Sequence, residues 1–175
     1  EMVKFSSIIV FNRCDGVKNL ASYRRMIRAF NQQGQVGFES SDGKMTTMLD
    51  EDLPYDINSD YIELDEASYP IWYLDVFDGA PKYQGKTIKF TAYVRDVTPH
   101  SLVVGRQIMT CCEDDIQFYG YEVIADDFVM NNSLVELEVE VIKNFSFIAN
   151  EEVVMLKAKS IKVLDYIPEK YLAFN

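Results

Sequence analysis

The residues best suited to chemistry gather in one short stretch in the second half of the chain. Cys111 and Cys112 are adjacent, and Glu113, Asp114 and Asp115 follow them directly. Thiolate sulfurs and carboxylate oxygens are ligands for zinc and other transition metals. This pattern therefore predicts a metal site made of the two thiols and a carboxylate from the acidic triplet.

Two other interpretations of the cysteine pair stay open. Free cysteine is among the most buried residue types, so Cys111 and Cys112 could simply pack as small hydrophobic side chains. They could also act in redox chemistry, although the acidic neighbours would raise thiol pKa values and disfavour a reactive thiolate. Successive side chains on a strand point to opposite faces, so joint metal binding requires a bend or bulge near residue 112.

Support for an enzyme is weak in this sequence. His100 is the one histidine, and it lies at the far end of the strand predicted to lead to the cysteines, which disfavours a Cys/His hydrolase and a histidine metal ligand. A further metal ligand would have to be Cys14, a carboxylate or solvent. The chain has no phosphate-binding glycine loop, serine nucleophile elbow or zinc-protease helix motif. We therefore expect a non-enzymatic protein.

Composition limits the partners. The formal net charge is −11, which argues against a nucleic-acid backbone or an anionic lipid surface as the main partner. Three cysteines, an odd number, do not form the framework of a disulfide-rich scaffold. No apolar run is long enough to span a membrane, so we expect the chain as given to be soluble, without direct lipid binding.

The second half of the sequence has the pattern of a β-barrel. Five segments are rich in β-branched and aromatic residues and have short polar connections between them. We predict strands at residues 87–97, 101–112, 116–125, 134–147 and 153–165. Short links favour antiparallel neighbours, and strands of this length would curl to close their edges. The predicted fold class is mainly β with flanking helices (α+β), with a five-stranded OB-like antiparallel barrel at residues 87–166.

The segments ahead of the barrel are expected to form a helix and a separate N-terminal region. Residues 66–77 read as a helix, and the acidic, polar stretch 40–60 is the expected domain boundary. We predict a small mixed α/β region at residues 1–55, with a strand at 5–11, a basic helix at 20–30 and a hairpin at 36–48. It could be a divergent repeat. Residues 56–175 would form the helix plus barrel.

Several other side chains have a functional and a structural interpretation. Aromatic residues of the predicted strands could form a base-stacking platform, although acidic surroundings favour barrel core. They are Phe90, Tyr93, Phe118, Tyr119 and Tyr121. Arg106 could pair with the acidic triplet or with Glu122 across the sheet. Arg24, Arg25 and Arg28 form either a solvated helix face or a docking surface for an acidic partner.

One family resemblance adds to this interpretation. The segment Tyr-Gln-Gly-Lys-Thr-Ile at residues 83–88, followed by Arg106, residues 109–112, Asp115 and Gly120, resembles the YcgQ-like family of bacterial proteins. The resemblance spans residues 61–172. It implies a C-terminal soluble domain of the small subunit of a two-component membrane permease complex, attached to the membrane through a segment absent from this chain. It also implies Cys111, Cys112 and Asp115 as signature residues, with Arg106 adjoining and Asp114 beside them.

The preferred hypothesis is an accessory domain of a bacterial permease complex that binds zinc or another transition metal through Cys111, Cys112 and Asp115. Its partner would be the permease subunit or another membrane protein, and no nucleic acid. The alternative is an OB-type module with structurally buried cysteines. Such a module would bind a protein, an oligosaccharide or a single-stranded nucleic acid.

Overall fold

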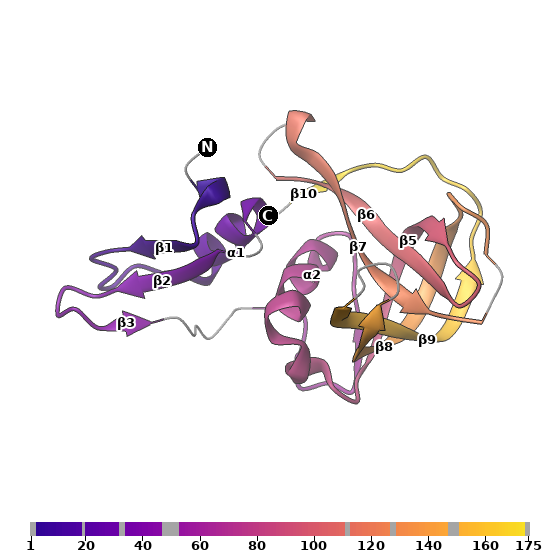
Figure 1. The fold of residues 1–175 in the computed structure, drawn as a ribbon, viewed down its shortest axis with the longest axis horizontal. Coiled ribbons are helices and arrows are strands. Elements are labelled where there is room, and N and C mark those ends of the chain that lie inside the picture. The colour runs from indigo at the N-terminus through magenta and orange to yellow at the C-terminus, as the bar shows by residue number, and fades with distance from the viewer. Residues whose placement is uncertain are drawn as a thin grey trace. The chain divides into compact units, whose positions relative to one another are not determined.

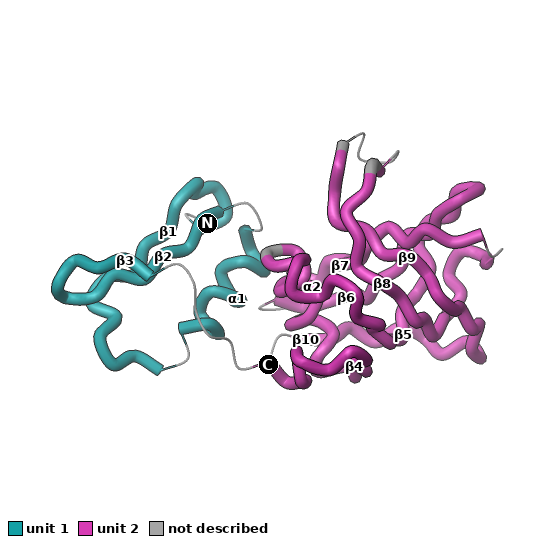
Figure 2. The backbone as a smooth tube through the Cα atoms, turned by 90° about the horizontal axis from the view of Figure 1, so that it is seen from below, with its two compact units in different colours: residues 1–52 teal, residues 53–175 magenta. Residues whose placement is uncertain are grey.

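The computed structural model describes residues 3–18, 20–31, 34–46, 53–110, 113–126, 129–146 and 151–173. The chain divides into two compact units, residues 1–52 and residues 53–175, which Figure 2 distinguishes by colour. Each unit is considered separately below.

Unit 1 is a small three-stranded sheet with one helix. Strand β1 (Ile8–Phe11) leads through helix α1 (Leu20–Phe30) to β2 (Gln35–Glu39), which pairs with β1 in parallel. Strand β3 (Met45–Thr46) returns antiparallel to β2, so the predicted hairpin is confirmed. The predicted first strand begins only at Ile8, because the residues before it form a short 3-10 helix, η1 (Val3–Phe5).

Unit 1 packs through small side chains of its helix and aromatic side chains of its strands. Ala21 and Ala29 of α1 are buried, and the ring of Phe11 stacks on Phe38 at 5.3 Å between centroids. Arg28 of the basic cluster donates from Nη1 to the carbonyl oxygen of Gly34 at 3.0 Å. At least one of the three arginines therefore holds the end of this helix to the start of β2.

Unit 2 begins with elements that lead into the barrel. Strand β4 (Tyr61–Glu63) pairs in parallel with the first barrel strand, and α2 (Ser68–Gly79) follows it. Before α2, the Asp65 carboxylate accepts a hydrogen bond from the Ser68 amide at 2.8 Å, a turn that starts the helix. The 3-10 helix η2 (Ala80–Tyr83) ends the helical segment, and Gly85, with φ of +78°, turns the chain into the barrel.

Five strands then close a barrel, which Figure 1 shows beside α2. They are β5 (Thr87–Val97), β6 (Ser101–Met109), β7 (Ile116–Ile124), β8 (Leu134–Ser146) and β9 (Glu151–Val163). The order is β6-β7-β9-β8-β5, and β5 pairs with β6 to close the ring. The predicted mainly β, OB-like fold is confirmed, with two helices and a mixed barrel.

The barrel is mixed and not wholly antiparallel as predicted. Pairs β5–β6, β6–β7, β8–β9 and β5–β8 are antiparallel, whereas β7–β9 is parallel. The reason is geometric: strand directions cannot alternate all the way round a closed ring with an odd number of members. The parallel pair is also short, with only Val123↔Leu156 and Ile124↔Lys157 in register.

The boundaries of two predicted strands also need correction. Strand β6 ends at Met109 instead of residue 112, because Thr110 lies in a bend that leads toward β7. Strand β9 begins at Glu151, two residues earlier than predicted. Strand β10 (Leu172–Ala173), parallel to β6, was not predicted, and nor was β4. Segments of two and three residues carry too little periodicity to be recognised.

The core of unit 2 combines barrel and helix side chains. Val104, Ile108, Val123, Leu137 and Leu156 are buried, as are Tyr69 and Trp72 of α2. The Trp72 ring lies 5.1 Å from Phe90 and 5.8 Å from Tyr121, between centroids. The apolar side of α2 therefore completes the barrel core. Among the described residues, no helix is long and apolar enough to cross a membrane.

Candidate functional site

The structure places part of the predicted metal site at the start of β7. Glu113–Asp115 forms a 3-10 helix, η3, in which Asp114 is exposed and Asp115 is half-buried. Burial raises the pKa of Tyr119, and the negative charge of Asp115 raises it further. Cys111 and Cys112 lie outside the described residues. No group of three potential ligands that could hold a metal ion occurs among the residues that are described.

Arg106 has a different partner from those predicted. It lies on the inner side of β6 with only 4% of its surface exposed, and its Nη2 donates to Oε1 of Glu66 at 3.1 Å. Its guanidinium carbon is 5.7 Å from the centre of the Tyr93 ring. Glu122 is opposite Val103 in the ladder, and Arg106 is opposite Tyr119, so the expected cross-strand pair is wrong.

The other candidate residues are distributed across the two units. His100 is exposed in the turn between β5 and β6. Cys14 is half-buried in unit 1, where its thiol donates to the carbonyl oxygen of Phe11 at 3.3 Å. Phe90, Tyr93, Tyr119 and Tyr121 are buried, so the barrel-core interpretation holds for them. Phe118 is half-buried, with the Arg95 guanidinium 5.1 Å from its ring centre.

A cleft that was not predicted opens beside the parallel strand pair. It has a volume of about 470 Å³, and its walls come from β6, β7, β8, β9 and α2. The lining residues are Tyr73, Phe77, Val103, Gly120, Tyr121, Glu122, Lys143, Ser146, Glu152, Val153 and Val154. Its size falls within the range typical of small-molecule sites. The β7–β9 ladder stops at Val123, and the space lies where these strands diverge.

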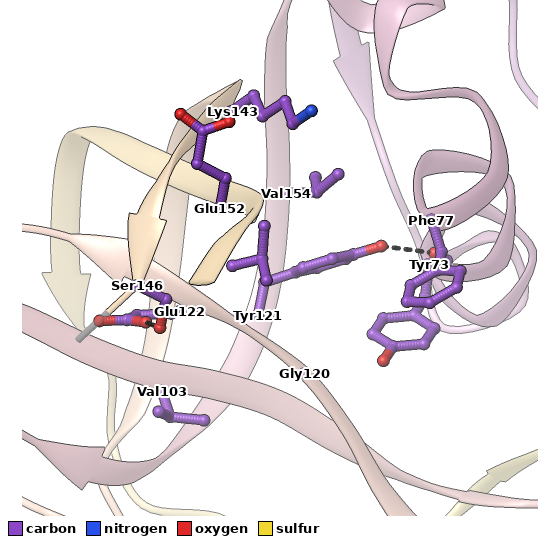
Figure 3. Close-up of a pocket in the computed structure, with 11 residues that line it drawn as sticks. Tyr73, Phe77, Val103, Gly120, Tyr121, Glu122, Lys143, Ser146, Glu152 and Val154 are labelled. Carbon is purple, nitrogen blue, oxygen red and sulfur yellow. Dashed lines mark hydrogen bonds between the residues drawn. The ribbon is translucent and has the colours of Figure 1, made fainter. Parts of the chain in front are cut away.

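The wall of the cleft toward α2 is aromatic. The Tyr121 hydroxyl donates to the carbonyl oxygen of Tyr73 at 2.7 Å, which holds β7 against the helix (Figure 3). Phe77 belongs to the same helix, lines the cleft and is 42% exposed. This wall offers apolar surface to a ligand.

Glu122 supplies a negative charge to the cleft. Its carboxylate accepts hydrogen bonds from the Ser101 hydroxyl at 2.8 Å and from the Ser146 hydroxyl. Both serines are buried, and they come from β6 and β8. An ionised carboxylate has about four acceptor positions, so two hydroxyls leave capacity for a further donor. The described side chains place no cationic group within ion-pair distance of Glu122.

This arrangement could not be read from the sequence. Ser101, Glu122 and Ser146 are separated by more than twenty residues from one another, and each looks like an ordinary polar position on a half-exposed strand. The nearest sequence signal is Gly120 within an otherwise aromatic strand, since an isolated glycine in a strand often marks a close backbone approach or a ligand.

The fold and these side chains define an OB-like barrel domain with an adjoining helix. The chain belongs to the family described as DUF1980 C-terminal domain, whose match covers residues 39–173 and so includes the whole barrel. No curated protein matches the chain.

Proposed function

We propose that this chain is a non-enzymatic accessory domain of a bacterial membrane permease complex. Its resemblance to the YcgQ-like family supports the permease context, and the DUF1980 family match and the OB-like barrel are consistent with a binding role. In this proposal a segment outside the chain attaches the protein to the membrane. The permease subunit is the partner.

The functional site of this domain, in our proposal, is a zinc or other transition-metal site at Cys111, Cys112 and Asp115. One observation carries it: Met109 and Ile116 are direct partners in the β6–β7 ladder. Paired residues of neighbouring strands lie about 5 Å apart, so the connection from Met109 to Ile116, which contains the two cysteines, joins two points that are close together. In the sequence only two residues separate Cys112 from Asp115, a spacing that suits shared coordination in this proposal.

The surroundings favour a cation at that connection. Glu113 and Asp114 add negative charge beside Asp115, and carboxylates and thiolates both bind divalent metals. Arg106, four residues before the bend at Thr110, has its charge directed to Glu66. The connection is therefore left with a net negative charge.

Equilibrium dialysis of the reduced protein against zinc tests the metal site. The expected result is one zinc per chain, which is lost in Cys111→Ser/Cys112→Ser and weakened about tenfold or more in Asp115→Asn. Cys14→Ser and Asp114→Asn are matched controls that should retain the metal. Equal retention by wild type and the double serine variant would overturn the metal site.

The permease context has a separate test. The full-length protein, solubilised in mild detergent, is expected to retain a polytopic membrane protein in a fixed ratio through two purification steps. A full-length protein that purifies without a membrane partner, while zinc binding persists, would overturn the permease context and leave the metal site standing.

The cleft supports a second candidate, an OB-type binding module in which the cysteines only pack. This candidate predicts thiols at residues 111 and 112 that react with a labelling reagent only after denaturation. A metal site predicts thiols that react in the folded protein and are protected by zinc.

A further inference from the structure

The cleft of unit 2 is bordered by strand edges that lack partners. Residues 116–122 of β7 pair with β6 on one side only, and residues 151–155 of β9 pair only with β8. Within the described part of the chain, no other strand pairs with either segment. An unpaired edge presents a row of amide and carbonyl groups and is a template for another strand.

The orientation of these groups follows from two opposed glycines. Gly105 and Gly120 are direct partners. A Cβ placed on Gly105 would lie 2.2 Å from the Tyr119 carbonyl oxygen, and a Cβ placed on Gly120 would lie 2.4 Å from the Val104 carbonyl oxygen. Both carbonyls therefore point between β6 and β7, which makes Gly105 and Gly120 a non-hydrogen-bonded pair. The amide and carbonyl of Gly120 must then point away from β6, toward the cleft that this residue lines.

Charged groups stand at both ends of the cleft. Figure 3 shows Glu122 beside Ser146 on one side and Lys143 on the other, with Tyr121 and Val154 between them. Lys143 is exposed, and no described carboxylate lies within ion-pair distance of its ammonium group. A ligand that spans the cleft therefore meets the Glu122 carboxylate, an apolar wall, and an end where the Lys143 ammonium group and the Glu152 carboxylate both lie.

We propose that this cleft binds a short extended peptide segment that adds to the free edge of β7 as a strand. Its backbone pairs with Gly120, a basic side chain reaches Glu122, and an acidic side chain reaches Lys143. In this mode the main chain supplies affinity and alternate side chains supply specificity. The inference concerns a site separate from the cysteine connection, and it stands whether or not a metal binds there.

The unpaired edge of β7 favours a peptide over other ligands that the cleft could hold. A small zwitterion could satisfy both charges, but it would leave the strand edge unpaired. An oligosaccharide would supply neutral hydroxyl groups, which bind less strongly to fixed charges than oppositely charged side chains do. A peptide strand satisfies the backbone groups, the apolar wall and the two charges together.

A positional-scanning library of acetylated and amidated hexapeptides, measured by fluorescence anisotropy, provides the probe. We expect pools with Lys or Arg at one position and Asp or Glu at another to bind about tenfold more tightly than pools with Ser there. Glu122→Gln should abolish the preference for the basic residue, and Lys143→Met the preference for the acidic residue. Glu140→Gln, the same change at an outward position of β8, should preserve both.

Peptide N-methylation tests the strand addition itself without altering the protein. Methylating alternate amides on one edge of the best hexapeptide should reduce binding at least tenfold, while methylating the other edge should have a smaller effect. Failure of every pool to bind at millimolar concentration, or equal binding by both methylated forms, would overturn the proposal. Free lysine competing as well as the hexapeptide would identify a small-molecule site instead.

Discussion

The buried guanidinium of Arg106 donates to the carboxylate of Glu66, 3.1 Å away. Glu66 lies just before α2 in the chain. The two side chains differ in exposure, at 5% for Arg106 and 74% for Glu66. Water therefore screens one half of the ion pair, while the other half is a desolvated charge. Such a pair links the helix to the barrel but contributes little net stability.

This difference in exposure predicts the effect of replacing each partner. Glu66→Gln should lower the free energy of unfolding by about 1 kcal/mol or less, because solvent screens the pair. Arg106→Met should stay within about 1 kcal/mol of wild type, since an apolar chain of similar length suits the barrel interior. Arg106→Ala should cost about 2–4 kcal/mol through the cavity it leaves. Urea unfolding measures all three, and equal losses in the methionine and alanine variants would contradict this account.

The paired glycines predict a second, larger effect. Gly105→Ala or Gly120→Ala would put a methyl group against backbone carbonyl oxygens that cannot move without disrupting the β6–β7 ladder. We expect a loss of about 3 kcal/mol or more in the free energy of unfolding. Gly79→Ala is the control, since its nearest neighbour is the flexible Lys82 side chain at 3.0 Å. Thermal unfolding that ranks Gly79→Ala as the most damaging change would refute the argument.

Buried tyrosines predict how stability depends on pH. Burial raises the pKa of Tyr69, Tyr83, Tyr93, Tyr119 and Tyr121 above the ordinary value of about 10. Because the neutral form is favoured in the folded state, their contribution is complete below about pH 10 and is lost as pH rises beyond it. Tyrosinate absorbance from these residues should appear together with the loss of circular dichroism. If all five of these tyrosines ionised near pH 10 while the fold stayed intact, they would not be buried as the structure shows.

The C-terminal segment predicts a local effect. Glu169 accepts hydrogen bonds from the Gln107 amide and from Arg95, both at 2.8 Å, and the Tyr93 hydroxyl donates to the Ile167 carbonyl oxygen. Glu169→Ala should therefore speed hydrogen exchange in residues 165–173 about tenfold or more, with little change in the barrel core. Lys170→Ala, next to it and exposed, is the control. Equal exchange in both variants would show that Glu169 does not hold the segment.

Much of the barrel was predictable because its strands are long. Residues 87–97 and 20–30 were assigned as the strand β5 and the helix α1 with the bounds that the structure has. Strong periodicity over ten or more residues outweighs local ambiguity. The same pattern says nothing of the direction of non-consecutive neighbours, so the parallel β7–β9 pair appeared only in the structure.

The candidate sites were less predictable because they combine distant segments. Arg106 pairs with a residue 40 positions earlier, and the cleft joins four strands and a helix. Adjacent thiols are visible in sequence because the chain itself brings them together. The metal site at Cys111, Cys112 and Asp115 stays a prediction, and so does the possible N-terminal repeat.

The central claim, shared coordination by the two thiols, is tested most directly by the absorption spectrum of the reduced protein with Co²⁺, a substitute for zinc. We predict a sulfur-to-cobalt charge-transfer band that saturates at one Co²⁺ per chain, persists in Cys14→Ser and disappears in Cys111→Ser/Cys112→Ser. A wild-type spectrum without this band, from protein whose thiols are reduced and whose fold is intact, would contradict the claim.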